Sequence, residues 1–477
     1  MEVLATKNLT YTFPGQEAPI FQGLSLSLHK GEFVLLSGES GCGKSTLLNC
    51  LNGVIPLIWQ GTMEGEVWVE GLNTASSTLK ALVQKVGTLW QDVESQLTQL
   101  SVEDELIFGL ENISIPREEG EERLKSIIPL VGLPREALLQ DLSGGQKQRL
   151  ALGALLAMLP QVILLDEPLA NLDHVGAHEF LKFLKTLCQQ GKTVLMVEHR
   201  LDLAARYVDR LLYMVDGRIA FDLRDRKQIE REEVRKRWAP SRLSVEPEDK
   251  PGFSSSPALD MQGLWANYGS HRVWQNINMR LQPGERLALI GSNGCGKSTF
   301  LKVVAGIKKG LKSGYERFEI LGRPVSKASR PFYSSQMGFV MQNPHHQLFM
   351  QNVFMEVALN TKGRTEATDI LNLFGLERLA SRHPLSLSQG QKRLLAVAAS
   401  LSHRPKILLL DEPTIGQDYT SLKKMIEVVN YLNRQWGMAV ITATHDMQAA
   451  KSLADRALLF NNGKVELLSI AEIPQGC

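Results

Sequence analysis

Two nine-residue stretches carry the residue types that hold phosphate groups. Residues 38–46 read Gly-Glu-Ser-Gly-Cys-Gly-Lys-Ser-Thr, and residues 291–299 read Gly-Ser-Asn-Gly-Cys-Gly-Lys-Ser-Thr. Glycines let the backbone curl so that successive amide groups point at an anion, and the start of a helix adds partial positive charge. The lysine can reach the β- and γ-phosphates, and the serine after it can ligate Mg²⁺. The pattern therefore predicts two nucleotide sites.

The elements around each stretch support this interpretation. The apolar run Phe33–Leu36 precedes the first stretch and the helix-prone run Leu47–Leu51 follows it, which is the strand, turn and helix that a phosphate loop requires. Its cysteine is expected to be a small packing residue rather than a nucleophile. The predicted ATP-binding residues of the two stretches are Gly38, Glu39, Ser40, Gly41, Cys42, Gly43, Lys44, Ser45 and Thr46, and Gly291, Ser292, Asn293, Gly294, Cys295, Gly296, Lys297, Ser298 and Thr299.

Two apolar, strand-like runs end in a pair of acids, at residues 162–167 (Val-Ile-Leu-Leu-Asp-Glu) and 407–412 (Ile-Leu-Leu-Leu-Asp-Glu). Alternation along a strand places the two carboxylates of a pair on opposite sides. The first acid can hold the Mg²⁺ shell, and the second can face the γ-phosphate as the general base for water. A strand-end histidine follows the aspartate of each pair by 33 and 34 residues, and it could align the γ-phosphate with the attacking water.

A glutamine ends another buried strand in each half, and its neutral amide can ligate Mg²⁺ or orient water. The predicted catalytic residues are therefore Glu167, His199, Glu412 and His445, and the predicted metal ligands are Ser45, Gln91, Asp166, Ser298, Gln342 and Asp411.

Further predicted ATP contacts are a helix start and an aromatic residue in each half. Ser143, Gly144 and Gly145 open one helix, where the serine can cap and the glycines allow an anion to approach closely. Ser388 and Gly390 open the other, with Gln389 in place of one glycine. Phe13 and Tyr268 could stack on adenine, or they are ordinary aromatic residues of a strand core.

These features recur in one order with nearly constant spacing. Lys44 and Lys297 lie 253 residues apart, and Asp166 and Asp411 lie 245 residues apart. The chain is therefore a duplication, which we divide into module one (residues 1–235), a linker (236–257) and module two (258–477). Each module is expected to be an α/β unit.

Composition narrows the class of protein. The 477 residues include 53 basic and 51 acidic residues, so the net charge is only +2. The chain as a whole therefore has no strongly positive electrostatic field that would argue for nucleic acid as a partner. Five cysteines, an odd number, argue against a disulfide framework and for a reducing cytosol. No signal peptide pattern and no apolar run of 18 residues occur, so any membrane span must come from another chain.

In this order and in duplicate, the motifs resemble the ATP-binding-cassette (ABC) ATPases. The resemblance implies a P-loop NTPase fold in each module, with a mainly parallel core sheet, an antiparallel β subdomain and a helical signature subdomain. It also implies head-to-tail pairing of the two modules within the chain, with two ATP molecules and Mg²⁺ between them. Residues 171–173 and 416–418 match the D-loop. Each ATP would be held by one module's phosphate loop and covered by the other module's signature, the helix start described above. Lys44 would therefore face Ser388 and Gly390.

A narrower resemblance follows the glutamines. Residues 91–97 and 101–112, and residues 342–349, resemble the ATPase subunits of energy-coupling factor (ECF) transporters, although Val93 departs from the usual proline. This implies a transmembrane coupling subunit, a substrate-binding membrane subunit for a vitamin or metal ion, and a peripheral place on the cytoplasmic face of the cell membrane. ATP would close the modules, and hydrolysis would reopen them. Because Gln389 would lie over the ATP held by Lys44, that site is expected to be the weaker one.

The alternative is a soluble tandem ABC ATPase that acts on the ribosome or on another non-transport partner. Such a translation factor would carry a long, basic, helical linker, whereas this linker is short and partly Pro/Ser-rich. Two other tandem classes require an LSGGNQQ signature or an N-terminal cysteine cluster, and the sequence has neither.

Overall fold

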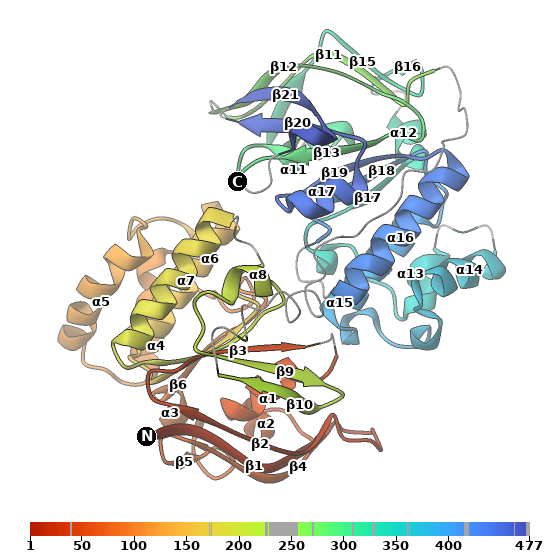
Figure 1. The fold of residues 1–477 in the computed structure, drawn as a ribbon. Coiled ribbons are helices and arrows are strands. Elements are labelled where there is room, and N and C mark those ends of the chain that lie inside the picture. The colour runs from red at the N-terminus through yellow and green to blue at the C-terminus, as the bar shows by residue number, and fades with distance from the viewer. Residues whose placement is uncertain are drawn as a thin grey trace. The chain divides into compact units, whose positions relative to one another are not determined.

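The computed structural model describes residues 1–38, 41–170, 172, 174–224, 228, 256–269, 271–307, 310–326, 330–359, 361, 363–414, 419–461 and 463–473. The chain divides into two compact units, Met1–Pro240 and Ser241–Cys477, which contain module one and module two (Figure 1). Several residues with a predicted role lie outside the described residues: Glu39, Ser40, Asn171, Asp173, Gly416, Gln417, Asp418 and residues 236–255 of the expected linker.

Module one combines two sheets with a group of helices. Its strands are β1 (Glu2–Thr12), β2 (Phe21–His29), β3 (Phe33–Gly38), β4 (Thr62–Val69), β5 (Leu72–Asn73), β6 (Val86–Leu89), β7 (Val162–Asp166), β8 (Thr193–Val197), β9 (Arg210–Val215) and β10 (Arg218–Leu223). Its helices are α1 (Lys44–Leu51), α2 (Val54–Leu57), α3 (Leu79–Val83), α4 (Val102–Asn112), α5 (Arg117–Val131), η1 (Leu139–Asp141), α6 (Gly144–Ala157), α7 (His174–Gln189) and α8 (Leu201–Ala204).

The six-stranded sheet of module one has the order β10-β9-β3-β8-β7-β6, and only the edge strand β10 is antiparallel to its neighbour. Its inner strands β3, β7 and β8 are buried throughout, because both faces of this part of the sheet are covered. Along β3, Phe33 and Leu35 pack into one core with α4 to α7, whereas Val34 and Leu36 pack into another with α1 and the second sheet. All four side chains are fully buried, so the strand that leads into the phosphate loop is rigidly held.

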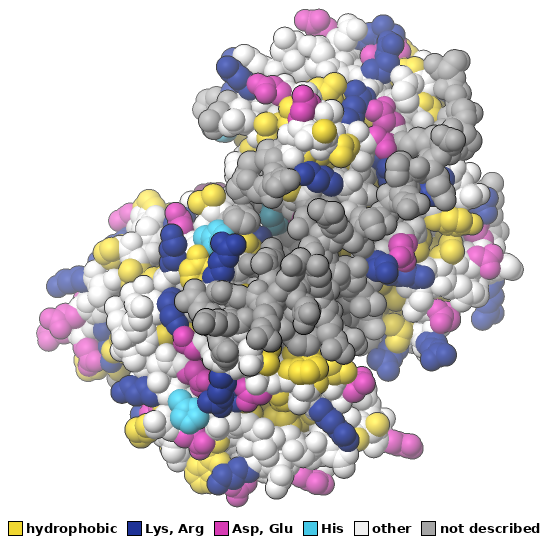
Figure 2. All heavy atoms as spheres, viewed as in Figure 1, with side chains coloured by type: hydrophobic (Ala, Val, Ile, Leu, Met, Phe, Trp, Pro, Cys, Tyr) yellow, Lys and Arg dark blue, Asp and Glu magenta, His cyan; other side chains and the backbone are white. Residues whose placement is uncertain are grey.

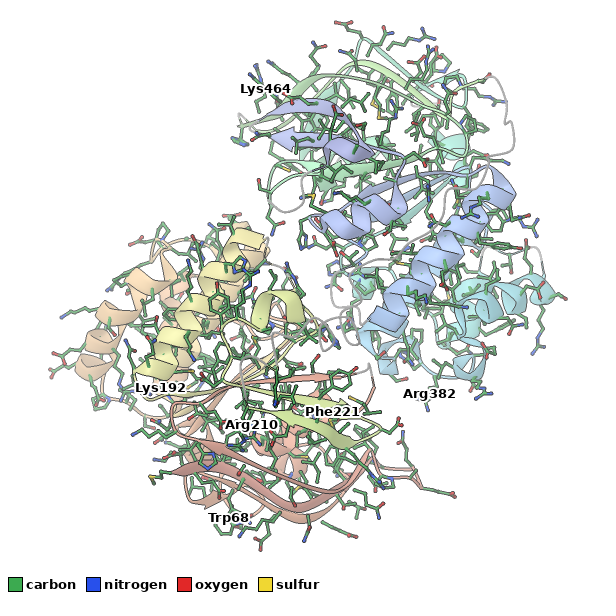
Figure 3. All side chains as sticks on the ribbon, viewed as in Figure 1. Trp68, Lys192, Arg210, Phe221, Arg382 and Lys464 are labelled. Atoms are coloured by element: carbon green, nitrogen blue, oxygen red, sulfur yellow. The ribbon has the colours of Figure 1, made fainter. Side chains whose placement is uncertain are left out.

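The second sheet of module one is antiparallel, with the order β2-β1-β4-β5. Alternation in β2, read from Leu24 to Leu28, places leucines inward and serines outward, as the sequence predicts. Arg210 of β9 links the two sheets (Figure 3): its guanidinium donates to both carboxylate oxygens of Asp222, at 2.7 Å each, and to the Ser27 carbonyl of β2, at 2.6 Å. These contacts fix the antiparallel subdomain against the parallel sheet.

Module two repeats this architecture. Its strands are β11 (Leu259–Tyr268), β12 (His271–Leu281), β13 (Arg286–Ile290), β14 (Leu311–Gly314), β15 (Arg317–Ile320), β16 (Arg323–Pro324), β17 (Met337–Val340), β18 (Ile407–Asp411), β19 (Ala439–Ala443), β20 (Arg456–Asn461) and β21 (Lys464–Ser469). Its helices are α11 (Lys297–Val304), α12 (Arg330–Gln336), η2 (Pro344–His346), α13 (Val353–Ala358), α14 (Arg364–Phe374), η3 (Glu377–Leu379), η4 (Pro384–Ser386), α15 (Gln389–Leu401), α16 (Tyr419–Trp436), α17 (Met447–Leu453) and η5 (Ile470–Glu472).

The two sheets of module two correspond to those of module one. The six-stranded sheet has the order β17-β18-β19-β13-β20-β21, again with one antiparallel edge strand, β21. The antiparallel sheet has the order β12-β11-β15-β16, and β14 also pairs with β11. Helices α13 to α16 form a group beside the parallel sheet (Figure 1). The α/β class with an antiparallel and a helical subdomain is therefore confirmed in both modules.

The described surface carries mixed charge. On the face in Figure 2, Lys and Arg side chains lie among Asp and Glu side chains in both modules, in keeping with the net charge of +2. Among the described residues, no helix has both the length and the apolar character needed to cross a membrane.

Candidate functional site

The first phosphate loop leaves β3 at Gly38 and enters α1 at Lys44. Gly38 has a φ of 153°, and a Cβ there would lie 2.2 Å from the carbonyl oxygen of Met214, so only glycine fits. Gly43, at the N-cap of α1, is left-handed with a φ of 103°. Lys44 is 6% exposed, and its Nζ donates to the Gly38 carbonyl over 2.9 Å. The described residues at the two ends of the loop thus place a buried ammonium group next to its first carbonyl.

The second phosphate loop repeats this geometry between β13 and α11. A Cβ on Gly291 would lie 2.4 Å from the carbonyl oxygen of Phe460, and Gly296 is left-handed with a φ of 107°. Lys297 donates from Nζ to the carbonyls of Gly291 and Ser292, over 2.8 and 3.1 Å. A Cβ on Gly294 would meet no atom within 4 Å, so there is open space beside this turn. The two loops are therefore equivalent.

The cysteines of the two loops are packing residues by location. Cys42 is buried, and its Sγ lies 3.8 Å from Nζ of Lys44. Burial raises the pKa of Cys42, which outweighs the opposing effect of the Lys44 charge. Burial likewise raises the pKa of Cys295. Neither thiol is activated as a nucleophile.

The aspartates that end β7 and β18 fit a divalent cation. Asp166 is 5% exposed, and its Oδ1 has no hydrogen-bond partner among the described residues. Burial, with the nearby Glu167 charge, raises the pKa of Asp166 to about 7 although Ser45 bonds to its carboxylate. In module two, Ser298 donates from Oγ to Asp411 over 2.7 Å, and burial raises the pKa of Asp411 to about 6. A buried carboxylate beside a serine hydroxyl is a hard oxygen site that suits Mg²⁺.

Each aspartate is followed by a glutamate with left-handed backbone. Glu167 has a φ of 48° and Glu412 a φ of 47°, which is uncommon for a residue other than glycine. The backbone amide of Glu167 donates to Val197 of β8 over 2.9 Å, and that of Glu412 donates to Ala443 of β19 over 2.8 Å. The strands end at the aspartates, so this turn, rather than strand alternation, determines the direction of each glutamate. Identical strain in both modules points to a functional constraint.

Glu167 lies at the centre of a hydrogen-bonded group. Gln91 donates to its Oε2 over 2.6 Å, and Nε2 of His199 lies 3.2 Å from its Oε1. Burial alone would raise the pKa of Glu167, but the His199 hydrogen bond and the charges of His199 and Lys44 outweigh it and hold the pKa below its ordinary value. The carboxylate is therefore ionised near neutral pH and able to accept a proton.

Glu412 has a related but different set of partners. Its Oε2 accepts from Nδ1 of His445 at 2.9 Å, and its Oε1 lies 3.5 Å from Nζ of Lys297. Here too burial would raise the pKa of Glu412, and the His445 hydrogen bond with the His445 and Lys297 charges lowers it below the ordinary value. Gln342 is exposed, and no hydrogen bond joins it to Glu412 in the described part of the chain. The two modules thus differ in how the glutamine meets the acid.

The signature residues lie apart from the phosphate loops in sequence and open long helices. Ser143 accepts from the Gln146 amide while the Gln146 side chain accepts from the Ser143 amide, which is a capping box, and Ser388 and Gln391 form the same box. Ser143 and Gly144 are exposed, so the start of α6 is accessible. Gln389 contacts His345 at 3.5 Å.

The aromatic positions stay predictions. Phe13 is half-buried and packs edge-on against Tyr11, with ring centroids 5.1 Å apart, whereas Tyr268 ends β11 and is 39% exposed. The sequence left open whether these rings stack on adenine or belong to the core, and the partial burial of Phe13 is compatible with both.

Sequence reasoning missed a second glutamine in each module. Gln96 accepts from the Trp90 amide at 3.2 Å and donates to the Thr88 carbonyl at 2.8 Å, which closes the loop after Gln91. Gln347 bonds in the same way to Met341 and Phe339. A constant separation of 251 residues, shared with Gln91 and Gln342, is the signal that could have found them.

A buried glutamate in each module also escaped notice. Glu105 is 5% exposed and accepts from the amides of Thr98 and Gln99, at 2.8 and 2.9 Å. Glu356, 3% exposed, accepts from the amides of Phe349 and Met350 at 3.0 and 2.8 Å. Each acid therefore fixes the segment that follows the Q-loop, the loop that begins at Gln91 in module one and at Gln342 in module two.

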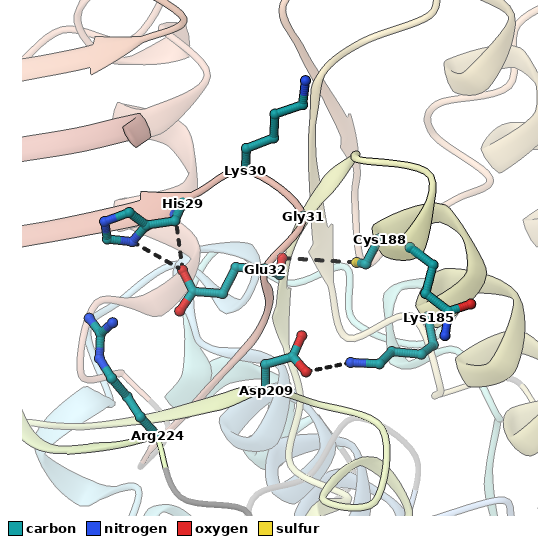
Figure 4. Close-up of a pocket in the computed structure, with 9 residues that line it drawn as sticks. His29, Lys30, Gly31, Glu32, Lys185, Cys188, Asp209 and Arg224 are labelled. Atoms are coloured by element: carbon teal, nitrogen blue, oxygen red, sulfur yellow. Dashed lines mark hydrogen bonds and ion pairs between the residues drawn. The ribbon is translucent and has the colours of Figure 1, made fainter. Parts of the chain in front are cut away.

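A cavity of about 480 Å³ in module one lies away from this chemistry (Figure 4). It is lined by residues that precede β3 and β9, including Glu32 and Asp209, and by Lys185, which pairs with Asp209. The phosphate loop lies at the other, carboxyl end of β3, where α/β sheets bind ligands. We therefore do not assign the nucleotide to this cavity.

The ABC transporter family matches this chain twice, at residues 21–170 and 274–415. The chain belongs to the ABC transporter ATPases. In this family the domains bind ATP with Mg²⁺ and hydrolyse it, and the duplicated match means that the chain carries two such domains. ATP would supply the phosphoryl group and Mg²⁺ would neutralise its charge. The buried aspartates and lysines and the adjoining serines described above fit both.

Curated relatives align with almost the whole length of this chain. The chain is 36% identical to "Putative HMP/thiamine import ATP-binding protein YkoD" of Bacillus subtilis (strain 168), over 97% of this chain and 90% of the relative. It is 34% identical to a "Putative ABC transporter ATP-binding protein" of Methanosarcina acetivorans, over 97% and 84%. The solved structure of the archaeal ribosome recycling factor aABCE1 with stalk protein aP1 matches with a TM-score of 0.62 and 18% identity, over 98% of this chain and 91% of that one, which shows a shared fold alone.

Proposed function

We propose that this ABC ATPase energises an importer of the energy-coupling factor type, which takes up a vitamin or a metal ion through a separate transmembrane partner. The observation that carries the transport part is the 36% identity, over 97% of the chain, to a protein named for HMP/thiamine import. The resemblance of residues 91–97 and 342–349 to ECF ATPase subunits supports the same type. The 18% identity to a ribosome recycling factor supports no shared partner.

The proposed chemistry follows from the described geometry. Lys44 or Lys297 holds the β- and γ-phosphates, and the Ser45–Asp166 or Ser298–Asp411 pair holds Mg²⁺. Glu167 or Glu412 accepts a proton from the attacking water. His199 and His445, within 3.2 and 2.9 Å of these acids, orient them and the water against the γ-phosphate.

We further propose that the two modules pair head to tail. The accessible N-terminus of α6, with its capping box at Ser143, is a suitable anion site, because the first amides of a helix have no partner within it. Replacing Ser143 with Arg is expected to suppress hydrolysis at the Lys297 site while the isolated affinity of each phosphate loop persists. Unchanged hydrolysis would exclude a composite site.

Docking of a membrane partner is proposed next to the Q-loops. There Leu100 is 81% exposed and Phe349 is 71% exposed, and each lies in a segment whose amides bond to a buried glutamate. Apolar side chains on a rigid backbone suit a partner helix because little ordering is needed on binding.

Affinity purification of the tagged chain from its native membranes tests the transport proposal. We expect integral membrane proteins to co-purify, and the reconstituted complex to import labelled thiamine, HMP or a metal ion when ATP is supplied. Ribosomal particles in place of membrane proteins would favour the soluble alternative. An assembled complex without ATPase activity would exclude energisation.

A further inference from the structure

In module one, an acidic and a basic residue, Glu198 and Arg200, flank His199. Both bond to the backbone of the segment after Glu167. Glu198 is 3% exposed. Its Oε1 accepts from the amides of His199 and Arg200, at 2.8 and 3.0 Å, and its Oε2 accepts from the Leu169 amide at 3.2 Å. Its carboxylate therefore spans the His199 loop and the segment after Glu167.

Arg200 bonds to the same segment as Glu198, but as a donor to carbonyl groups. Its Nη1 donates to the carbonyls of Leu169 and Leu172, at 3.1 and 3.0 Å. Leu169 is thus held at its amide by an acid and at its carbonyl by a guanidinium. Gln148 of α6 also donates to the Pro168 carbonyl. The backbone after Glu167 is consequently fixed from several directions, and hydrogen bonds to charged groups are roughly twice as strong as neutral ones.

Burial affects the ionisation of Glu198. Desolvation raises the pKa of Glu198, and the Glu167 charge raises it further, while the Arg200 amide and charge oppose both effects. A buried acid next to the acid that accepts the proton is costly unless it is well bonded. Three backbone amides donate hydrogen bonds to the two carboxylate oxygens of Glu198, and these bonds offset the cost of burying its charge.

The corresponding positions of module two carry Thr444 and Asp446. Thr444 Oγ1 accepts from the Asp446 amide at 3.0 Å and lies 3.5 Å from the hydroxyl of Thr414, the counterpart of Leu169. Asp446 accepts from the Ala449 amide at 3.0 Å, which caps α17. An ionised aspartate only accepts hydrogen bonds, so it cannot donate to peptide carbonyls as Arg200 does. The two modules therefore join these segments by different chemistry.

We propose that Glu198 and Arg200 are positioning residues that couple His199 to Leu169 and Leu172, and through them to Glu167. ATP hydrolysis at the first site then depends on this clamp, which the residue types at the second site do not form. The inference rests on the proposed function, in which Glu167 accepts a proton from the attacking water and His199 orients it. It concerns the turnover number and not the holding of ATP, because neither clamp residue belongs to the phosphate loop.

The double variant Glu198→Thr/Arg200→Asp tests the clamp, because it gives module one the Thr-His-Asp loop that the same chain already folds at residues 444–446. It is made in the full chain carrying Glu412→Gln, so that the remaining hydrolysis reports the first site. If Glu412→Gln alone abolishes ATP hydrolysis by the chain, the two sites are coupled. The double variant is then measured in the otherwise unchanged chain, where coupling makes a loss at the first site lower the total rate of hydrolysis.

We expect kcat to fall about tenfold while the Kd for a fluorescent ATP analogue and the melting temperature change little. Arg200→Ala should behave similarly, and Arg200→Lys should recover part of the rate, because its ammonium group keeps the positive charge and can still donate to a carbonyl. The matched control is Asp446→Asn, which keeps the α17 cap and should leave kcat within twofold.

Three outcomes would overturn the clamp: kcat within twofold of the parent, equal losses for Arg200→Lys and Arg200→Ala, or a parallel loss of ATP binding and melting temperature. Glu167→Gln is measured alongside. If it leaves hydrolysis intact, the proposed function of Glu167 fails, whereas loss with Glu167→Gln and none with the double variant counts against the clamp alone.

Discussion

The side-chain amide of Gln91 donates a 2.6 Å hydrogen bond to the carboxylate of Glu167. No hydrogen bond joins the corresponding glutamine, Gln342, to Glu412 in the described part of the chain. The phosphate-loop lysine acts on the acid in both modules: the Lys44 charge lowers the pKa of Glu167, and Nζ of Lys297 lies 3.5 Å from Oε1 of Glu412. The two halves of this duplicated ATPase therefore share their residue types but not their hydrogen-bond arrangement, which bears on how each site works.

Replacing the glutamates tests whether the sites are equivalent. Glu167→Gln and Glu412→Gln each remove a proton acceptor, and such a group contributes about 10²–10⁴-fold to a rate. We expect Glu412→Gln to cost the larger share of total turnover, because Gln389 is proposed to lie over the ATP held by Lys44. Steady-state phosphate release checks this, with Glu427→Gln on the exposed face of α16 as the control. Equal losses would contradict the proposed asymmetry.

The arrangement that gathers the site residues could be predicted from the sequence because it follows from sheet geometry. Lys44, Asp166 and His199 each follow the carboxyl end of a buried strand, and β3, β8 and β7 are parallel neighbours in the sheet. Parallel strands bring such ends to one edge. The repeat then supported each assignment twice, so the fold of both modules was also predictable.

The clamp could not be predicted, for a physical reason. Glu198 and Arg200 bond to backbone groups, and every residue other than proline offers the same backbone donor and acceptor, so such a partner leaves no trace in residue type. Module two has Thr444 and Asp446 there, so comparison of the repeats argues against a shared function. The left-handed backbone at Glu167 was equally hidden, since a glutamate in a run of strand residues favours extended backbone.

Asp166 predicts a pH dependence of stability without nucleotide and metal. Its folded pKa of about 7 exceeds the ordinary 3.8, so the folded chain keeps a proton between about pH 4 and 7 that the unfolded chain releases. The free energy of unfolding should therefore fall as pH rises through this window, by at most about 1.4 kcal/mol per pH unit. The lowered pKa of Glu167 stabilises the folded chain fully above its ordinary 4.5 and adds no slope there.

Urea unfolding in EDTA at intervals from pH 5 to 8 measures this slope. Asp166→Asn should reduce it, leaving the contributions of Asp411, whose pKa of about 6 ends its window sooner, and of Glu198, whose pKa is also raised by burial. Asp369→Asn, at an exposed position of α14, is the control. A slope that persists unchanged in Asp166→Asn would show that the buried aspartate is not its source.

Gln96 is expected to be a stability residue of the Q-loop. Gln96→Ala removes both of its backbone bonds and leaves the Trp90 amide and Thr88 carbonyl without these partners, which should cost about 1–3 kcal/mol. Gln347→Ala should cost a similar amount in module two, and Gln351→Ala, at an exposed position, should cost little. Urea unfolding gives the cost, and hydrogen exchange should rise within residues 88–96 of Gln96→Ala. Unchanged exchange there would refute the structural function of Gln96.

Leu100 and Phe349 test the proposed docking surface. Their exposed fractions, 81% and 71%, are too large for either side chain to support the core, so Leu100→Asp and Phe349→Asp should leave ATP hydrolysis by the purified chain within about twofold. An ionised carboxylate is costly to bury in an apolar contact, so co-purification of the membrane partner should fall about tenfold or more. Leu467→Asp, on the edge strand β21 and 55% exposed, controls for the added charge. If all three variants retain the partner equally, docking does not occur next to the Q-loops, and the buried glutamates Glu105 and Glu356 must hold these segments for a purpose inside the ATPase itself.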